Sequence, residues 1–91
     1  MSTRYVASAD VHATNRLTQI WTQASSADRA LITRASNRID AELSEDADQK
    51  GIPLASVSPT LRYLDISPLR VYFHALVAAQ IALIIDYERI P

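Results

Sequence analysis

The sequence predicts an α+β domain in which two antiparallel helices pack on a short antiparallel sheet. Two stretches with helical periodicity follow each other in the first half of the chain, and three runs rich in aromatic and β-branched residues fill the second half. A chain of 91 residues is long enough for one hydrophobic core and too short for two. We therefore expect a single domain over residues 1–91.

The first helix is expected to follow a β-prone segment, Arg4–Ser8, which predicts the first strand. Asp10 predicts the N-cap, because its carboxylate accepts hydrogen bonds from the free N–H groups of the first turn. The helix is predicted over Val11–Gln23, and its apolar stripe consists of Leu17, Ile20, Trp21 and Ala24. Trp21 is therefore interpreted as a core residue.

The second helix has its start signal at Ser25, which stands three residues before Asp28, the spacing of a capping box. Its apolar stripe is predicted to be Leu31, Ala35, Ile39 and Leu43. Its charged residues fall mostly off that stripe and are interpreted as a solvated face: Arg29, Arg34, Arg38, Asp40 and Glu42. Because the linker between the helices is short, the two must lie antiparallel.

The segment Ser44–Pro53 breaks the periodicity and is predicted to be a loop. Gly51, the only glycine, is expected to end the helix or to form a turn. The apolar residues that follow predict that the later part of the loop lies against the domain: Leu54, Val57 and Pro59.

Three strands are predicted in the second half. Leu61–Ile66 and Leu69–Leu76 form a tight hairpin, since only Ser67–Pro68 separates them and proline cannot donate to a strand ladder. A third strand over Gln80–Tyr87 pairs with the second across Val77–Ala79, a linker without the Gly, Asn or Asp that hairpin turns prefer.

A single helix from Leu69 to about Glu88, capped by Ser67, competes with the last two strands. Its β-branched and aromatic residues would lie almost all round such a helix, which favours strands. A membrane span is disfavoured, because polar residues interrupt the run at Arg70, His74 and Gln80.

Composition narrows the class of protein. The chain has no cysteine, which excludes disulfides and thiolate metal sites, and its first residues lack the apolar core of a signal peptide. We expect a cytoplasmic protein. The net charge of −1 gives no global attraction to nucleic acid or anionic lipid. Eight of the nine cationic residues are arginines, however, so the composition is still compatible with a local basic patch.

The segment Ser67–Phe73, with the sequence SPLRVYF, is similar to a strand of the RelE/ParE toxin superfamily, which includes plasmid stabilisation proteins. Ile81–Ile90 resembles the closing strand of that family, and Asp28–Ala30 and Ala35–Asp40 resemble its second helix. The resemblance implies the order strand, helix, helix and three strands. It also implies the toxin of a bacterial type II toxin–antitoxin system, acting in the cytoplasm and neutralised by a cognate antitoxin.

Alternation along Leu69–Leu76 places Arg70, Tyr72 and His74 on the sheet face away from the helices. If the chain resembles the ribosome-dependent RNases of the family, Arg70 is the cation for the developing phosphorane charge and His74 the proton-transfer group. Tyr72 would position the substrate or act as an acid. Arg62 and Arg89 would add RNA or partner contacts.

Other interpretations stay open. The resemblance extends equally to toxins that block DNA gyrase, which need no catalytic set, and the strand before Arg70 offers Arg62 but no lysine nearer than Lys50. A non-toxic interaction module, either a homodimer through a sheet edge or a decayed family member that binds an antitoxin, is the alternative. His12 has no second histidine or acid pair at metal-ligand spacing, and no cofactor motif is present, so we expect neither metal nor cofactor.

Overall fold

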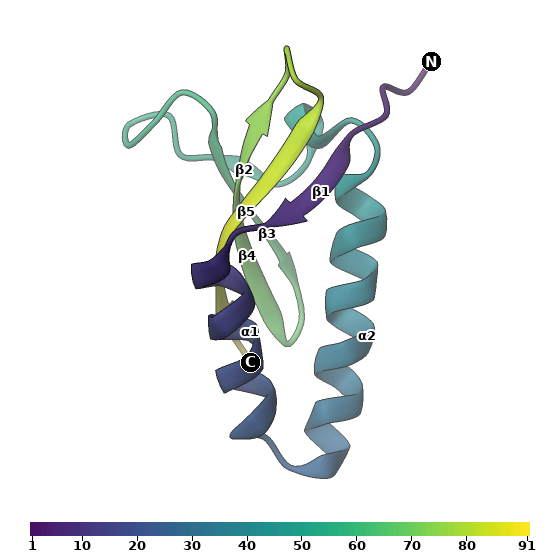
Figure 1. Cartoon of the computed structure of the whole chain (residues 1–91), viewed down its shortest axis with the longest axis vertical. Coiled ribbons are helices and arrows are strands. Elements are labelled where there is room, and N and C mark those ends of the chain that lie inside the picture. The colour runs from purple at the N-terminus through teal and green to yellow at the C-terminus, as the bar shows by residue number, and fades with distance from the viewer.

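The computed structural model describes all 91 residues, and its element order is strand, two helices, one 3-10 turn and four strands (Figure 1). The elements are β1 (Val6–Ala9), α1 (Val11–Thr22), α2 (Ser26–Leu43), η1 (Ala47–Gln49), β2 (Ile52–Pro53), β3 (Leu61–Ile66), β4 (Leu69–Leu76) and β5 (Ile81–Arg89). The predicted α+β class and the predicted order of helices and long strands are confirmed.

The sheet has the strand order β1-β5-β4-β3-β2, so β4 is central. β1 runs parallel to β5, and the other neighbours are antiparallel, which makes the sheet mixed. The first strand is thus an edge strand that lies beside the last one. α1 begins directly after β1, and between them the Asp10 N–H donates to the Ile84 carbonyl at 3.0 Å. α1 packs chiefly along β5, while α2 packs against β4, β3 and β1.

β2 is the one strand that the sequence pattern did not predict, because it has only two residues and one is a proline. It pairs with β3 through Ile52 opposite Tyr63. Gly51 makes this approach possible: it has φ +67°, and a Cβ atom there would lie 2.0 Å from the Tyr63 carbonyl oxygen. The expectation of a turn at Gly51 is confirmed, whereas α2 ends earlier, at Leu43, with Ser44 as its C-cap.

Both predicted helix starts are confirmed. The Asp10 carboxylate accepts from the Ala13 N–H at 2.8 Å, and the Ser25 hydroxyl oxygen accepts from the Asp28 N–H at 3.2 Å. Each bond satisfies a donor that the first turn of a helix leaves free. The end of α1 is held by Arg29 of α2, whose guanidinium donates to the carbonyls of the last turn.

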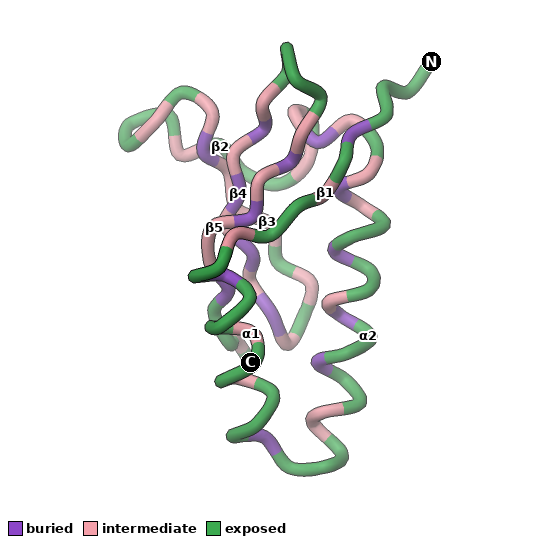
Figure 2. The backbone as a smooth tube through the Cα atoms, viewed as in Figure 1, coloured by how far each residue is buried: buried purple, intermediate pink, exposed green.

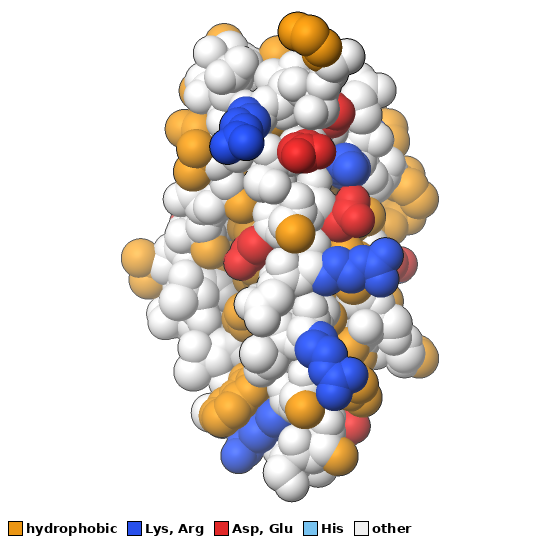
Figure 3. Space-filling view, turned by 90° about the vertical axis from the view of Figure 1, so that its right-hand side faces the viewer, with side chains coloured by type: hydrophobic (Ala, Val, Ile, Leu, Met, Phe, Trp, Pro, Cys, Tyr) orange, Lys and Arg blue, Asp and Glu red, His pale blue; other side chains and the backbone are white.

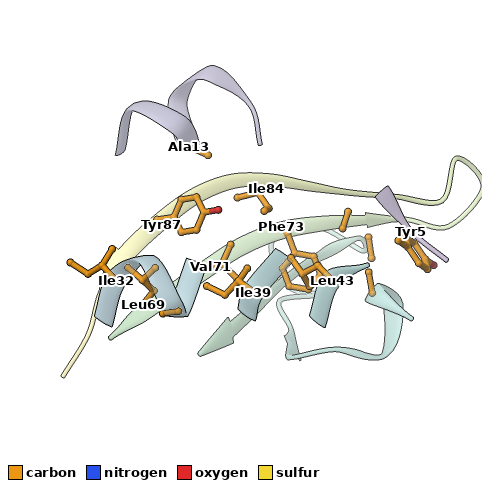
Figure 4. Packing of buried hydrophobic residues seen from close by; sticks show 14 of the residues in the cluster. Tyr5, Ala13, Ile32, Ile39, Leu43, Leu69, Val71, Phe73, Ile84 and Tyr87 are labelled. Carbon is orange, nitrogen blue, oxygen red and sulfur yellow. The ribbon is translucent and has the colours of Figure 1, made fainter. Parts of the chain in front are cut away.

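The core lies between the helices and one face of the sheet. Along β4 the side chains alternate strictly between buried and half-buried, as the purple and pink segments of Figure 2 show. In the close view of Figure 4, Leu69, Val71 and Phe73 of β4 meet the buried side chains of α2. Together with Ala75, which is also buried, they are the set predicted to lie under the helices. Tyr87 and Ile84 of β5 extend this layer toward Ala13 of α1.

The prediction that Trp21 and Leu31 lie in the core is wrong. Trp21 is 41% exposed and Leu31 is 48% exposed, whereas Ile32, next to Leu31, is fully buried. The other three residues of the predicted α2 stripe, Ala35, Ile39 and Leu43, are buried as predicted, so only the first position of the stripe shifts. α1 presents Ala13, a side chain small enough for close contact with the sheet. Trp21 is left on the flank of α1. Val57 is also exposed, so the tip of the loop before β3 does not lie against the domain.

The last two strands exclude the competing helix. β4 and β5 pair from Leu69 opposite Arg89 to Leu76 opposite Ile81. The linker lacks the favoured turn residues, and Gln80 itself takes the left-handed conformation that closes the turn, with φ +55°. The bulge in β5 near Ile84 has no counterpart in the sequence-based prediction.

The outer side of α2 is polar, as the predicted solvated face requires. Basic and acidic side chains are interspersed over this side of the molecule, and neither sign dominates it (Figure 3). Arg34 and Arg38 are exposed on this side, and Asp40 is exposed on the side of α2 that carries Thr33 and Ser36. Arg29 and Glu42, the other two members of the predicted solvated face, are half-buried. Neither α1 nor α2 combines the length and the apolar character that crossing a bilayer would require.

Candidate functional site

The candidate site is the sheet face opposite the helices, which we call the open face. Cross-strand partners point to the same side of a sheet, so the register defines its members. They form four rows across the strands: Val6, Ile81 and Leu76; Ser8, Leu83, His74 and Leu61; Asp86, Tyr72, Tyr63 and Ile52; Glu88, Arg70 and Asp65. The first two rows are therefore mainly apolar, the third joins two tyrosines to Asp86, and the fourth, near the β3–β4 hairpin, is charged throughout.

Arg70 lies in the charged row, where the sequence placed it, but its guanidinium is engaged. Nε donates to Asp65 Oδ1 at 2.6 Å and Nη2 donates to Oδ2 at 2.9 Å, a bidentate pair. The guanidinium also lies 4.5 Å from the ring centroid of Tyr63. The hydrogen bonds from Arg70 hold the pKa of Asp65 below its usual range, and the same bonds raise the pKa of Arg70.

His74 lies two rows away from Arg70 and is held by the loop before β3. Its Nδ1 is 2.8 Å from the Thr60 hydroxyl oxygen, and the Thr60 carbonyl accepts from the Ala75 N–H. The imidazole is half-buried between apolar neighbours in its row, Leu83 and Leu61. The contact ties the loop to the central strand.

Tyr72 stands between these two residues and faces Tyr63 across the strands. The ring centroids are 6.3 Å apart and the planes are tilted by 46°, within the range of favourable aromatic pairs. Both rings are half-buried and neither is covered by a helix. They continue the apolar rows toward the charged one.

The open face thus brings Arg70, Tyr72 and His74 onto one surface but not to one point. Arg70 and His74 are four residues apart on an extended strand, roughly 13 Å by the usual rise per residue. One guanidinium is turned to Asp65 and the imidazole to Thr60. Arg70 could therefore serve as the cation at a scissile RNA phosphate only if its ion pair with Asp65 were broken.

Arg62 and Arg89 lie on the other side of the sheet. Their cross-strand partners are Phe73 and Leu69, which face the core. Arg62 Nε donates to the Lys50 carbonyl at 2.6 Å, which holds the chain next to Gly51. Arg89 Nη2 donates to an Asp28 carboxylate oxygen at 2.6 Å and joins β5 to the first turn of α2. Neither guanidinium lies beside the residues of the open face.

The sequence contained a signal for the Asp65 and Tyr63 contacts that the strand prediction did not use. A two-residue hairpin loop at Ser67–Pro68 fixes the register of both strands. Asp65 then stands opposite Arg70, and Tyr63 stands opposite Tyr72, as observed. The contact between Thr60 and His74 had no such signal, because it depends on the path of an irregular loop.

His12 lies on α1 beside Arg16 and beside Asp86, which is the β5 member of the Tyr72 row. Its Nε2 is 3.4 Å from Asp86 Oδ1, and Arg16 Nε is 3.5 Å from the same oxygen. No group of three histidine, aspartate or glutamate side chains comes together in a metal-binding arrangement.

No protein-family model matches the chain, and no curated protein is significantly similar to it.

Proposed function

We propose that the chain is a RelE/ParE-like toxin of a type II toxin–antitoxin system, which inhibits bacterial growth by binding its target through the open face. The observation that carries the proposal is the character of that face. Half-buried and exposed apolar side chains run across five strands with no helix over them. Binding of a partner that removes such a surface from water lowers the free energy of the system.

Family membership is part of the proposal and rests on the strand and helix segments that resemble the superfamily. The observed order of strand, two helices and antiparallel meander is compatible with it. A cognate antitoxin would neutralise the chain by covering the same face. We also infer that the chain acts in the bacterial cytoplasm. Proteins in that reducing compartment are stable without disulfides, and this chain has no cysteine to form one.

A binding mode is better supported than RNA cleavage. A nuclease needs a free cation and a proton-transfer group around one phosphate. Here Arg70 is paired with Asp65, and His74 is directed to Thr60. DNA gyrase is therefore the target that we favour, and the ribosome with its mRNA is the second target.

Induction of the chain alone in a bacterial host tests this proposal. We expect growth arrest while cellular mRNA stays intact, and relief when a short reading frame next to the gene is co-expressed. Unimpaired growth at good soluble expression would refute toxicity. Fragmented mRNA would refute the binding mode, and Arg70→Ala would then lower cleavage by roughly 10²–10³-fold, as loss of an oxyanion-stabilising group does.

The alternative is an interaction module without toxicity, either a homodimer or a protein that binds and buffers an antitoxin. The specific observation in its favour is Val6, which is 65% exposed on the edge strand β1 at the end of an apolar row. Sedimentation of the purified chain at high concentration separates the versions, since a monomer excludes the homodimer.

A further inference from the structure

A groove separate from the open face runs between the two helices. It has a volume of about 220 Å³, and its lining combines apolar and polar side chains: Leu17, Thr18, Trp21, Ile32, Thr33, Ser36 and Asn37. In Figure 1 the two helices stand side by side above their connecting turn. Trp21, which was predicted to lie in the core and is exposed, borders this groove.

Trp21 is exposed yet held in place. The guanidinium of Arg29 lies 4.4 Å from the centre of its ring and is itself fixed by hydrogen bonds to the Trp21 and Thr22 carbonyls. A fixed, partly exposed tryptophan loses little conformational entropy when it is covered, and tryptophan is prominent among the residues that dominate binding energy. Beside it, Leu17 and Ile32 form an apolar floor.

The walls of the groove determine which backbone can occupy it. Both walls are helices, whose backbone groups are paired within each helix. An extended peptide would find no strand edge to pair with there, and only four side chains, those of Thr18, Thr33, Ser36 and Asn37, could bond its N–H and C=O groups. A helix satisfies its backbone internally, so it is the conformation that fits between α1 and α2.

Two charged residues of α2, Arg29 and Asp40, flank the groove residues Thr33 and Ser36 along the helix and have no oppositely charged partner. Arg29, Thr33, Ser36 and Asp40 follow each other on one side of α2 at helical spacing. Arg29 is bonded only to carbonyls, and Asp40 has no ion pair or hydrogen bond. Partial burial raises the pKa of Asp40, so a cation placed beside it would be favourable. The two residues are roughly 16 Å apart along the helix, about three turns.

We propose that this groove binds an amphipathic helix of a partner protein, about three turns long. Its apolar side chains contact Leu17 and Trp21, an acidic residue lies near Arg29, and a lysine or arginine lies near Asp40. The site is distinct from the open face, so the proposal does not depend on the proposed function.

Selection from a displayed library of helical peptides against the purified chain tests it. Trp21 is the only tryptophan, so its fluorescence reports occupation of the groove by peptides that lack tryptophan. We expect selected peptides to carry an apolar stripe flanked by an acid at one end and a base at the other. Thr33→Arg, which fills the groove, should weaken their binding at least tenfold. Asn15→Arg adds the same charge to the exposed side of α1 and should change binding by less than twofold.

A charge exchange tests the assigned end. Asp40→Lys should weaken binding at least fivefold, and replacing the basic residue of the peptide by Glu should restore it. Failure to select any peptide, or peptides that bind Thr33→Arg as well as the parent chain, would overturn the proposal. Peptides that are lost instead with Leu83→Glu would place the helix on the open face, which overturns this inference and leaves the proposed function intact.

Discussion

Gly51→Ala perturbs the contact that joins β2 to the rest of the sheet. The left-handed φ costs a residue with a Cβ about 1–2 kcal/mol. The new Cβ would also lie 2.0 Å from the Tyr63 carbonyl oxygen, so β2 would have to move by about 1 Å or more. That movement strains the Ile52–Tyr63 pairing and the bond from Arg62 to Lys50, at about 1 kcal/mol each. The free energy of unfolding should fall by about 3–4 kcal/mol, measured by urea denaturation.

Gly51→Asn separates the two causes. Asparagine tolerates the left-handed conformation better than alanine but carries the same Cβ. If the clash with Tyr63 dominates, the two variants should be destabilised by similar amounts. A Gly51→Ala protein that unfolds within about 0.5 kcal/mol of the parent would refute the claim that β2 needs a glycine for its approach to β3.

Three further predictions concern the rest of the sheet. Gln80→Asn should raise the free energy of unfolding by about 0.5 kcal/mol, because asparagine accepts φ +55° more readily than glutamine; a loss of stability in urea denaturation would contradict this account of the turn. Phe73→Ala should lower it by about 3–5 kcal/mol, because the ring is fully buried, and a cost below about 1 kcal/mol would place Phe73 outside the core. Burial raises the pKa of Tyr87 to about 12, while the unfolded chain releases that proton near pH 10. The free energy of unfolding should therefore fall by about 1.4 kcal/mol per pH unit between about pH 10 and 12, and Tyr87→Phe should remove this contribution from urea titrations; an unchanged slope would contradict it.

Local rules were sufficient where local chemistry decides. The Asp10 and Ser25 caps depend on a side chain and a backbone group three residues apart, and both were predicted. The alternation along β4 placed Arg70 and His74 on the open face, because a central strand beneath helices buries every second residue.

The remaining features depend on contacts between distant segments. Leu31 and Ile32 are adjacent apolar residues, and only the packing of α2 on the sheet selects Ile32 for the core. Arg62 shares its side of β3 with Leu64, which packs against the core, so strand alternation could have placed it away from Arg70. The path of the loop that carries Thr60 to His74 has no periodic pattern to predict it.

The central claim is that the open face is the surface through which the chain acts. The most direct test compares growth after induction of the parent chain, Leu83→Glu on the open face and Leu31→Glu on the outer side of α2. Circular dichroism and soluble yield would establish that all three fold. We expect the parent and Leu31→Glu to arrest growth and Leu83→Glu to be at least tenfold less inhibitory. Equal inhibition by the two glutamate variants, or no inhibition by the parent chain, would contradict the account.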